Sequence, residues 1–207
     1  MKVDTKAKIL ETALYEFATR GYDQTATRDI LAKAKANVAA ISYYFGNKKG
    51  LYIEVLSSIA AKIADAFKDL LPAYQALSKT KATPKECEEL LKKFVRVFVE
   101  LFCSDKKTTA MCMVFVREYV EPSRDFKPFF QDINADYRRI FVDLLIKANH
   151  NELTRKEAVL QVVMLFSFIF SLVTRKNIIL DAMQWKEYSP KAVDELMSVI
   201  SRGLFRK

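Results

Sequence analysis

The sequence predicts an all-α protein of about nine helices. Glycine and proline are scarce, with four and five in 207 residues, and they stand at the borders between apolar segments. Within those segments the apolar residues recur every three or four positions, which is the period of an amphipathic helix. Two segments also open on a capping box, Thr83 with Glu86 and Thr154 with Glu157, in which side chains satisfy the first backbone N–H groups of a helix. No segment shows a convincing strand pattern.

Four helices are expected in the N-terminal part. The first has an apolar face and should stop at Gly21. Thr27 is expected to cap a short second helix, and Asn37 is expected to cap the third. Asn47 is expected to cap a long fourth helix that ends or kinks near Pro72. The apolar face of the first helix consists of Leu10, Ala13, Leu14, Phe17 and Ala18.

Five longer, more aromatic helices are expected in the rest of the chain. The Thr83 capping box starts the first of them, Ser104 the second and Ser123 the third. The Thr154 capping box starts the most apolar helix, and Ser189, which is followed by a proline, starts the last. The change from short to long helices near residue 50 predicts a boundary between two parts.

Composition and cysteine content restrict the class of protein. The net charge of +9, from 34 Lys and Arg against 25 Asp and Glu, favours a polyanionic partner, either nucleic acid or an anionic membrane. The odd number of cysteines and the absence of C-x-x-C spacing indicate thiols in a reducing cytoplasm. A lone histidine, His150, supports neither a catalytic triad nor a metal site.

The N-terminus lacks a signal peptide's apolar run, and the longest apolar block, 162–173, is shorter than the roughly 20 residues that span a bilayer. We therefore expect a cytoplasmic protein without a metal or another cofactor. The cysteines are Cys87, Cys103 and Cys112.

The second and third helices have the spacing of a helix-turn-helix. Their sequences, TRDILAKA and VAAISYYF, are joined by about three residues. In that motif the second of the two helices enters the major groove of DNA. Ile41 and Phe45 lie four residues apart, so both can anchor the third helix on the first. The residues left for its outer face are Asn37, Val38, Ala39, Ser42 and Tyr43.

Small residues on this outer face suit close approach to base edges. Val38 or Ala39 can touch a thymine methyl group. Asn37 and Ser42 can form hydrogen bonds with bases.

Larger residues next to them suit phosphate contacts. The hydroxyl of Tyr43 is expected to reach a phosphate, whereas Tyr44 either does the same or packs against the fourth helix. Lys48 stands at the start of the fourth helix, where free backbone N–H groups and its own charge favour a phosphate. The alternative for Lys48 and Lys49 is a solvated face.

Residues 6–55 resemble the DNA-binding domain of TetR-family transcriptional repressors. The family pattern has F-x-x-x-G-[YF] in the first helix, T-[ST]-x-x-x-I/L at the second, and [LI]-Y-x-[HY]-F-x-[SN]-K-x-x-L at the third. Two positions depart from it: Lys35 stands in the turn where the family usually has glycine, which predicts slight strain, and Ser42 replaces the first aromatic residue, which shortens one usual DNA contact. The matching segments are Phe17 to Tyr22, Thr25 to Ile30 and Ile41 to Leu51.

The resemblance implies a protein with two parts. Residues 1–47 would form the helix-turn-helix DNA-binding domain, and residues 48–207 the larger helical bundle for ligand binding and dimerisation. The segment FVREYVEPSRDF, 115–126, is similar to regulators of the AcrR type. The last two helices, about 155–180 and 190–205, would form a four-helix dimer interface, and the alternative is a helix buried in the core of a monomer. The family's DNA-contact positions fall on Thr27, Asn37, Val38, Ala39, Ser42, Tyr43, Tyr44 and Lys48.

The aromatic residues after position 90 permit two interpretations. Phenylalanines at helical spacing usually form a core. So many rings in one bundle could also wall an apolar effector cavity. Polar residues within such walls would orient a ligand, although a structural role is favoured for each of them. The candidates are Cys112, Arg117, Glu118 and Tyr119.

Three functions compete at this point. The favoured one is a homodimeric, ligand-responsive DNA-binding regulator, a repressor that a small, largely apolar effector releases from a palindromic operator. An enzyme is disfavoured because the sequence has no glycine-rich phosphate loop, no histidine-based constellation and no cysteine with an adjacent base. A membrane-surface protein is disfavoured because no helix concentrates lysines opposite a wholly apolar face. Salt-sensitive binding to a palindromic duplex would distinguish the first from the others.

Overall fold

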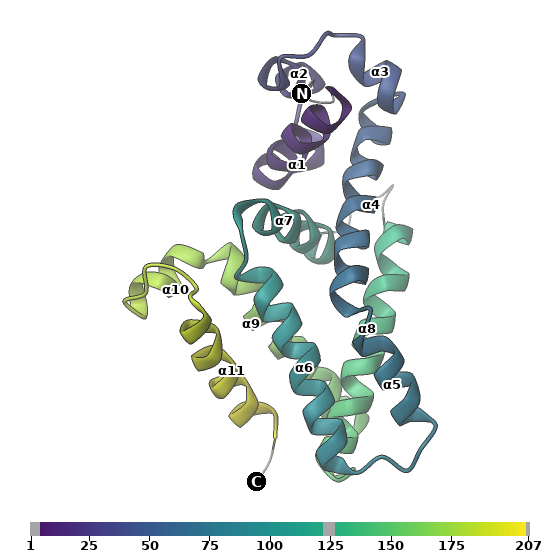
Figure 1. The fold of residues 1–207 in the computed structure, drawn as a ribbon, viewed down its shortest axis with the longest axis vertical. Coiled ribbons are helices and arrows are strands. Elements are labelled where there is room, and N and C mark those ends of the chain that lie inside the picture. The colour runs from purple at the N-terminus through teal and green to yellow at the C-terminus, as the bar shows by residue number, and fades with distance from the viewer. Residues whose placement is uncertain (1–4, 122–126, 206–207) are drawn as a thin grey trace. The chain divides into compact units, whose positions relative to one another are not determined.

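The computed structural model describes residues 5–121 and 127–205, and this part of the chain is all-α, with eleven helices and no strand (Figure 1). The expected fold class is confirmed. The helices are α1 Thr5–Gln24, α2 Thr27–Ala34, α3 Ala40–Phe45, α4 Lys48–Phe67, α5 Leu70–Ser78, α6 Pro84–Phe102, α7 Lys106–Val120, α8 Lys127–Ala148, α9 Arg155–Thr174, α10 Lys176–Ala182 and α11 Pro190–Leu204.

Side-chain caps fix several of these boundaries. Both capping boxes are present: Thr83 and Thr154 each accept a hydrogen bond from the backbone N–H of the glutamate three residues later, and each glutamate accepts one in return. The Oδ1 of Asn47 accepts from the N–H of Gly50 at 2.9 Å and so caps α4. Ser189 caps α11, with Pro190 as its first residue. These helix starts agree with the sequence because each is set by residues next to it.

Two of the expected helices are divided. The long fourth helix becomes α4 and α5, a break that places Pro72 in the first turn of α5, where its missing N–H removes no helical hydrogen bond. The segment expected at about 155–180 becomes α9 and α10, which are separated at Arg175. The helix start expected at Ser123 lies outside the described residues.

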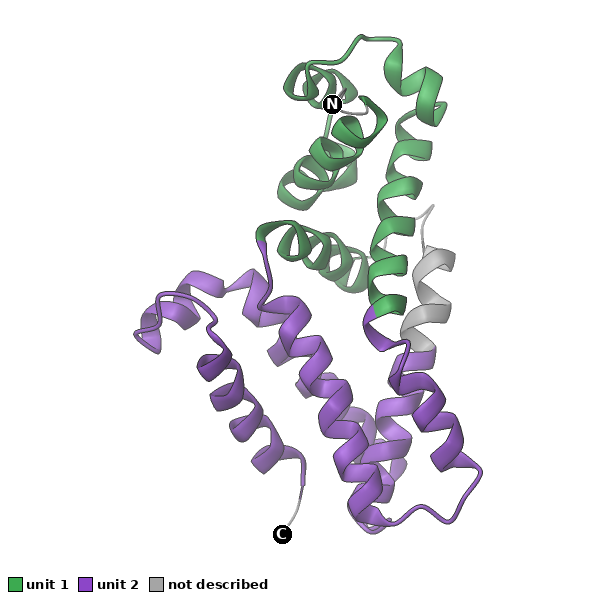
Figure 2. Cartoon of the chain, viewed as in Figure 1, with its two compact units in different colours: residues 1–65, 106–122 green, residues 66–105, 123–207 purple. Residues whose placement is uncertain are grey.

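The helices belong to two compact units (Figure 2). Unit 1 comprises residues 1–65 and 106–122, and unit 2 comprises residues 66–105 and 123–207. Unit 1 therefore contains α7 in addition to α1, α2, α3 and most of α4.

Aromatic rings and a backbone turn organise the core of unit 1. The buried ring of Tyr52 lies 4.7 Å from Phe17, edge to face, and 4.8 Å from Tyr22, between centroids. Helical geometry in α1 is interrupted at Gly21, as expected, with φ 80° and ψ 172°. Only glycine adopts this conformation readily, and it turns the chain so that Tyr22 can reach the same core.

A second group of rings forms the core of unit 2. The ring of Phe98 is its centre, with centroids 4.7 Å from Phe67, 5.4 Å from Phe166 and 5.6 Å from Phe141. Phe98 is only 3% exposed, and its neighbours from α4, α8 and α9 are equally enclosed. The geometry is that of closely packed aromatic pairs. We call these residues the aromatic cluster: Phe67, Phe94, Phe98, Tyr137, Phe141 and Phe166.

Helix α9 is the one helix, among the described residues, whose length and composition would allow it to cross a membrane. Its 20 residues extend beyond the apolar block 162–173 that the sequence indicates. The buried core helices of soluble proteins meet the same criterion, and 44% of the apolar window of α9 is buried. The observation is therefore weak evidence for a membrane span.

Candidate nucleic-acid interface

The turn between α2 and α3 is closed by backbone geometry. Lys35 takes the left-handed conformation, φ 52° and ψ 44°, and its N–H donates to the carbonyl of Ala32. The N–H of Ala36 donates to Leu31 at 3.0 Å. Lys35 thus fills the role of the glycine that the family pattern has here, and a side chain in this conformation costs roughly 1 kcal/mol.

Asn37 holds the next part of the turn. Its Oδ1 accepts from the N–H of Ala39 at 2.9 Å, and its carbonyl accepts from the N–H of Ala40 at 2.9 Å. The expectation that Asn37 caps α3 is wrong, because the helix begins only at Ala40 with Ala39 in the cap position. The side chain instead closes an Asx turn around Val38, a competing hydrogen bond that asparagine commonly makes.

Helix α3 has one buried side and one open side. Ala40 and Ile41 are buried, and Phe45 is half-buried with the Nζ of Lys6 5.6 Å from its ring centroid. Together they fix α3 on unit 1, so the remaining side chains point outward. The outward side chains of α3 include Tyr43, 81% exposed, and Ser42, and the turn before α3 adds Val38, 85% exposed, with Asn37 and Ala39.

The two tyrosines at the end of α3 differ in exposure: Tyr43 is on the surface, whereas Tyr44 is partly packed. The ring of Tyr44 is 37% exposed and lies edge to face against Tyr43, with centroids 4.8 Å apart. Both hydroxyl groups remain candidates for phosphate contact, and this interpretation stays a prediction.

Lys48 begins α4, as expected, but its side chain has partners within unit 1. Its Nζ lies 4.4 Å from the ring centroid of Tyr22 and donates to the carbonyl of Asp23 at 3.3 Å. Lys48 therefore fixes the segment that precedes α2 on the start of α4. A phosphate contact from the same ammonium group stays a prediction.

The start of α2 offers a candidate DNA contact that is not among the residues expected from the sequence. Thr27 is the first residue of α2, and the cap position belongs to Ala26 without a side-chain hydrogen bond, so the expected Thr27 cap is wrong. The next residue, Arg28, has a side chain that is 90% exposed. A cation beside the free N–H groups of a helix start favours a phosphate. The sequence could have pointed to Arg28, because it directly follows Thr27, an expected DNA-contact position.

Ion pairs fix α2 on α1. The buried carboxylate of Glu16 accepts a short hydrogen bond from Lys33. Arg20 lies 3.7 Å from Glu16 and donates to Asp29 at 3.2 Å. These cations are thus partly neutralised within unit 1, and the Nε of Arg28 also lies 3.7 Å from Asp29. Because the Arg28 side chain is still 90% exposed, it forms the more open part of this surface together with the outer face of α3.

Two family models match the chain. The model of bacterial regulatory proteins of the tetR family matches residues 9–55, and that of the C-terminal domain of the HTH-type transcriptional dual regulator CecR matches residues 87–205. The chain belongs to the TetR family of transcriptional regulators. Membership of the TetR family thus rests on the helix-turn-helix and on the larger C-terminal segment alike.

Curated relatives agree with this assignment. The chain is 47% identical over 57 residues to the probable HTH-type transcriptional regulator YttP of Bacillus subtilis (strain 168), a match that covers 28% of each chain. It is 31% identical over 122 residues to the HTH-type transcriptional dual regulator CecR of Shigella flexneri, which covers 57% of this chain and 52% of the relative. The chain spans about half the length, or less, of the curated relatives it matches.

Solved structures share the TetR-family fold. A TetR-like regulator from Rhodococcus sp. RHA1 has a TM-score of 0.68 at 18% identity and covers 96% of this chain and 93% of its own. AibR in complex with isovaleryl coenzyme A and operator DNA has a TM-score of 0.67 at 15% identity, with coverage of 95% and 97%. FadR from Bacillus subtilis in complex with stearoyl-CoA has a TM-score of 0.60 at 19% identity, with coverage of 96% of each chain. At these identities the likeness concerns the fold alone.

The four candidate ligand residues of this TetR-family chain all lie on α7 in unit 1. Arg117 donates to the carbonyls of Ala18 and Thr19 at 3.1 and 2.9 Å, near the end of α1. Glu118 is buried and accepts from the hydroxyl of Tyr52 at 2.7 Å. These contacts have the structural character that is favoured from the sequence, and a ligand role stays a prediction. The other two candidates are Cys112, which is buried, and Tyr119, which is half-buried.

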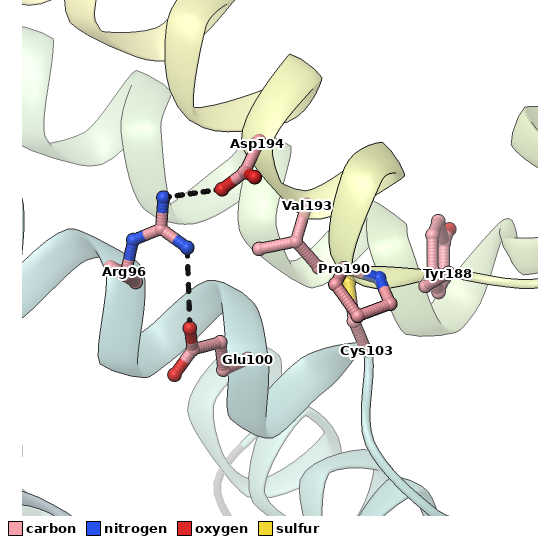
Figure 3. A pocket seen from close by; sticks show the side chains of 7 residues that line it. All are labelled: Arg96, Glu100, Cys103, Tyr188, Pro190, Val193 and Asp194. Atoms are coloured by element: carbon pink, nitrogen blue, oxygen red, sulfur yellow. Dashed lines mark hydrogen bonds and ion pairs between the residues drawn. The ribbon is translucent and has the colours of Figure 1, made fainter.

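Unit 2 contains a surface hollow of about 360 Å³ that the sequence did not indicate (Figure 3). Arg96 on its rim donates to Asp194 at 2.6 Å and to Glu100 at 3.4 Å, so these charges are paired with one another. Burial raises the pKa of the Cys103 thiol to about 12, which keeps it protonated and unreactive. None of the four α7 candidates lines this hollow. Its lining residues are Arg96, Glu100, Cys103, Tyr188, Pro190, Val193 and Asp194.

Replacing Tyr52 by phenylalanine is expected to lower the free energy of unfolding by about 1–3 kcal/mol at neutral pH, because a buried carboxylate loses a donor. Burial first, and then the hydrogen bond to Glu118, raise the pKa of Tyr52 above its ordinary 10.0. The unfolded chain loses the proton above pH 10.0 while the folded chain keeps it, so the stability that Tyr52 contributes is complete below that pH and declines above it. Chemical denaturation at neutral and alkaline pH should show a weaker alkaline decline in Tyr52→Phe. Tyr43→Phe is the control, and an equal decline in both variants would contradict the assignment.

Proposed function

We propose that this TetR-family chain is a homodimeric, ligand-responsive transcriptional regulator, a repressor that a small, largely apolar effector releases from a palindromic operator. The outward side of α3 and the turn before it support this proposal, since Tyr43 is exposed on a helix whose other side is fixed by Ile41, and Val38 is exposed in the turn. In this proposal residues 1–47 bind DNA, and residues 48–207 bind the effector and form the dimer. The protein would act in the cytoplasm.

An apolar face of α9 supports the dimer. Leu160, Val163, Met164 and Phe168, which we call the α9 strip, are 63%, 44%, 70% and 37% exposed. Their spacing of three and four residues places them on one side of the helix. An apolar face of this kind on a single chain marks an interaction surface, and a two-fold dimer would bury it against its own copy. We propose that the interface comprises about 155–180 and 190–205.

The effector proposal draws on the neighbours. The solved structures of AibR and FadR are complexes with isovaleryl coenzyme A and stearoyl-CoA, respectively. They share only the fold with this chain, so they support an effector with an apolar part and not a particular compound.

The effector would act on the distance between the two DNA-binding domains of the dimer. These domains can contact both half-sites when the half-sites lie about one helical turn apart, roughly 34–36 Å. An effector that binds another spacing more tightly would shift the population away from the DNA-bound form.

Selection of bound duplexes from a random DNA library, at near-physiological salt, tests this function. The expected product is a palindrome with two half-sites, whose affinity falls steeply as salt is raised. The recovered duplex then serves as the probe in a screen for effectors that release it. Recovery of no sequence above background would contradict the proposed function.

A further inference from the structure

The segment from Ala36 to Asn47, which carries the residues proposed to read bases, lacks the side chains that usually read guanine and cytosine. Between Ala36 and Asn47 the chain has no Arg, Lys, Asp, Glu, His or Gln. Arg and Lys make the common contacts with guanine O6 and N7, and Asp and Glu accept from cytosine N4. Direct readout by α3 therefore uses other chemistry.

The usual adenine contact is restricted as well. Asparagine reads adenine with its amide oxygen and nitrogen together. In this structure the Oδ1 of Asn37 accepts from the N–H of Ala39 at 2.9 Å, so the amide oxygen is turned back toward the chain's own backbone. The Nδ2 group remains as a donor, which alone does not distinguish adenine from guanine at N7.

The side chains that remain in the turn before α3 form a hydrocarbon surface. Val38 is 85% exposed and Ala39 beside it is exposed as well. The hydrogen bonds of Asn37 with the N–H groups of Ala39 and Ala40 close the turn around Val38, so the backbone that presents its two methyl groups is ordered before DNA is bound. The hydroxyls of Ser42 and Tyr43 can donate or accept and so distinguish little between bases.

The geometry points to Val38 as a reader of the 5-methyl group of a pyrimidine. A thymine methyl is the hydrocarbon feature of the major-groove edge, and 5-methylcytosine places the same group at the same position. We therefore propose that each half-site contains a pyrimidine whose 5-methyl group packs on Val38. This inference rests on the proposed function and specifies the DNA that it requires.

Methyl deletion in the selected duplex tests the inference. Each thymine is replaced in turn by deoxyuridine, at the same position of both half-sites. At one position this change should lower affinity by about four-fold for each methyl lost, the value of one buried carbon. At that position a 5-methylcytosine–guanine pair should also bind more tightly than a cytosine–guanine pair.

A Val38→Ala variant identifies the side chain responsible. In this variant the affinity for thymine should exceed that for deoxyuridine at the sensitive position by less than about two-fold. The reason is that the Val38 side chain and the 5-methyl group stabilise the complex only when both are present. Val120→Ala is a matched control, since Val120 is 71% exposed on α7 in the same unit, and it should leave the ratio of the two affinities unchanged.

The outcomes separate this inference from the function on which it depends. A recovered duplex that binds equally with thymine and deoxyuridine at every position overturns the inference alone. A methyl effect that Val38→Ala leaves intact overturns the assignment to Val38. Failure to recover any duplex overturns the proposed function, and the inference with it.

Discussion

A Met164→Glu variant is expected to be a monomer in solution and to bind a palindromic duplex much more weakly. Met164 is 70% exposed at the centre of the α9 strip, which the proposed dimer buries against its own copy. In a two-fold interface each substitution enters twice. Burying two unpaired carboxylates should raise the dimer dissociation constant about a thousand-fold or more, because desolvation of each charge costs several kcal/mol.

Sedimentation or light scattering over a range of concentrations measures this change directly. Val120→Glu is the control, since it places the same charge at another exposed apolar position, and it should remain a dimer. Binding to a single half-site should be retained by Met164→Glu, because α3 is unchanged. A dimeric Met164→Glu protein would contradict the assignment of α9 to the interface.

A Phe98→Ala variant is expected to lose about 3–5 kcal/mol of unfolding free energy, the usual cost of removing a fully buried phenylalanine. Its ring lies within 4.7–6.0 Å of four others in the aromatic cluster. Close-packed rings cannot collapse fully into the space that the substitution opens, so lost contacts and a residual cavity both contribute.

Chemical denaturation of the unsubstituted protein and of Phe98→Ala tests this prediction. It also distinguishes a packed aromatic core from rings that wall an effector cavity. Phe205→Ala is the control, since Phe205 is half-buried, and its effect should be smaller. A loss below about 1 kcal/mol in Phe98→Ala would favour rings that wall an adaptable cavity over rings that form a packed core.

Helix boundaries were predictable where neighbouring residues determine them. Thr83, Thr154 and Asn47 cap helices through bonds to residues three positions away, so a local pattern is sufficient. The break between α9 and α10 at Arg175 has no glycine or proline beside it and left no such signal. Pro72 did signal a break, but the sequence does not say that a new helix begins just before it, at Leu70.

The candidate DNA surface was predictable to the extent that it follows one helical period. Burial of Ile41 fixes α3, and exposure of Tyr43 follows from it, whereas Val38 is exposed in the turn that precedes the helix. Contacts between distant residues were not predictable. Lys48 reaches Asp23, and Arg117 reaches Ala18, across 25 and 99 positions, and neither contact leaves a local pattern.

The passage of the chain between the two units bears on how such regulators can be recombined. The chain changes unit after residues 65, 105 and 122. A fusion with a single junction behind α4 would exchange α1 to α4 and keep the host's α7, so Glu118 would face a foreign residue in place of Tyr52. A chimera with altered operator choice should therefore carry two segments from one parent, 1–65 and 106–122, or combine parents that share this tyrosine and glutamate.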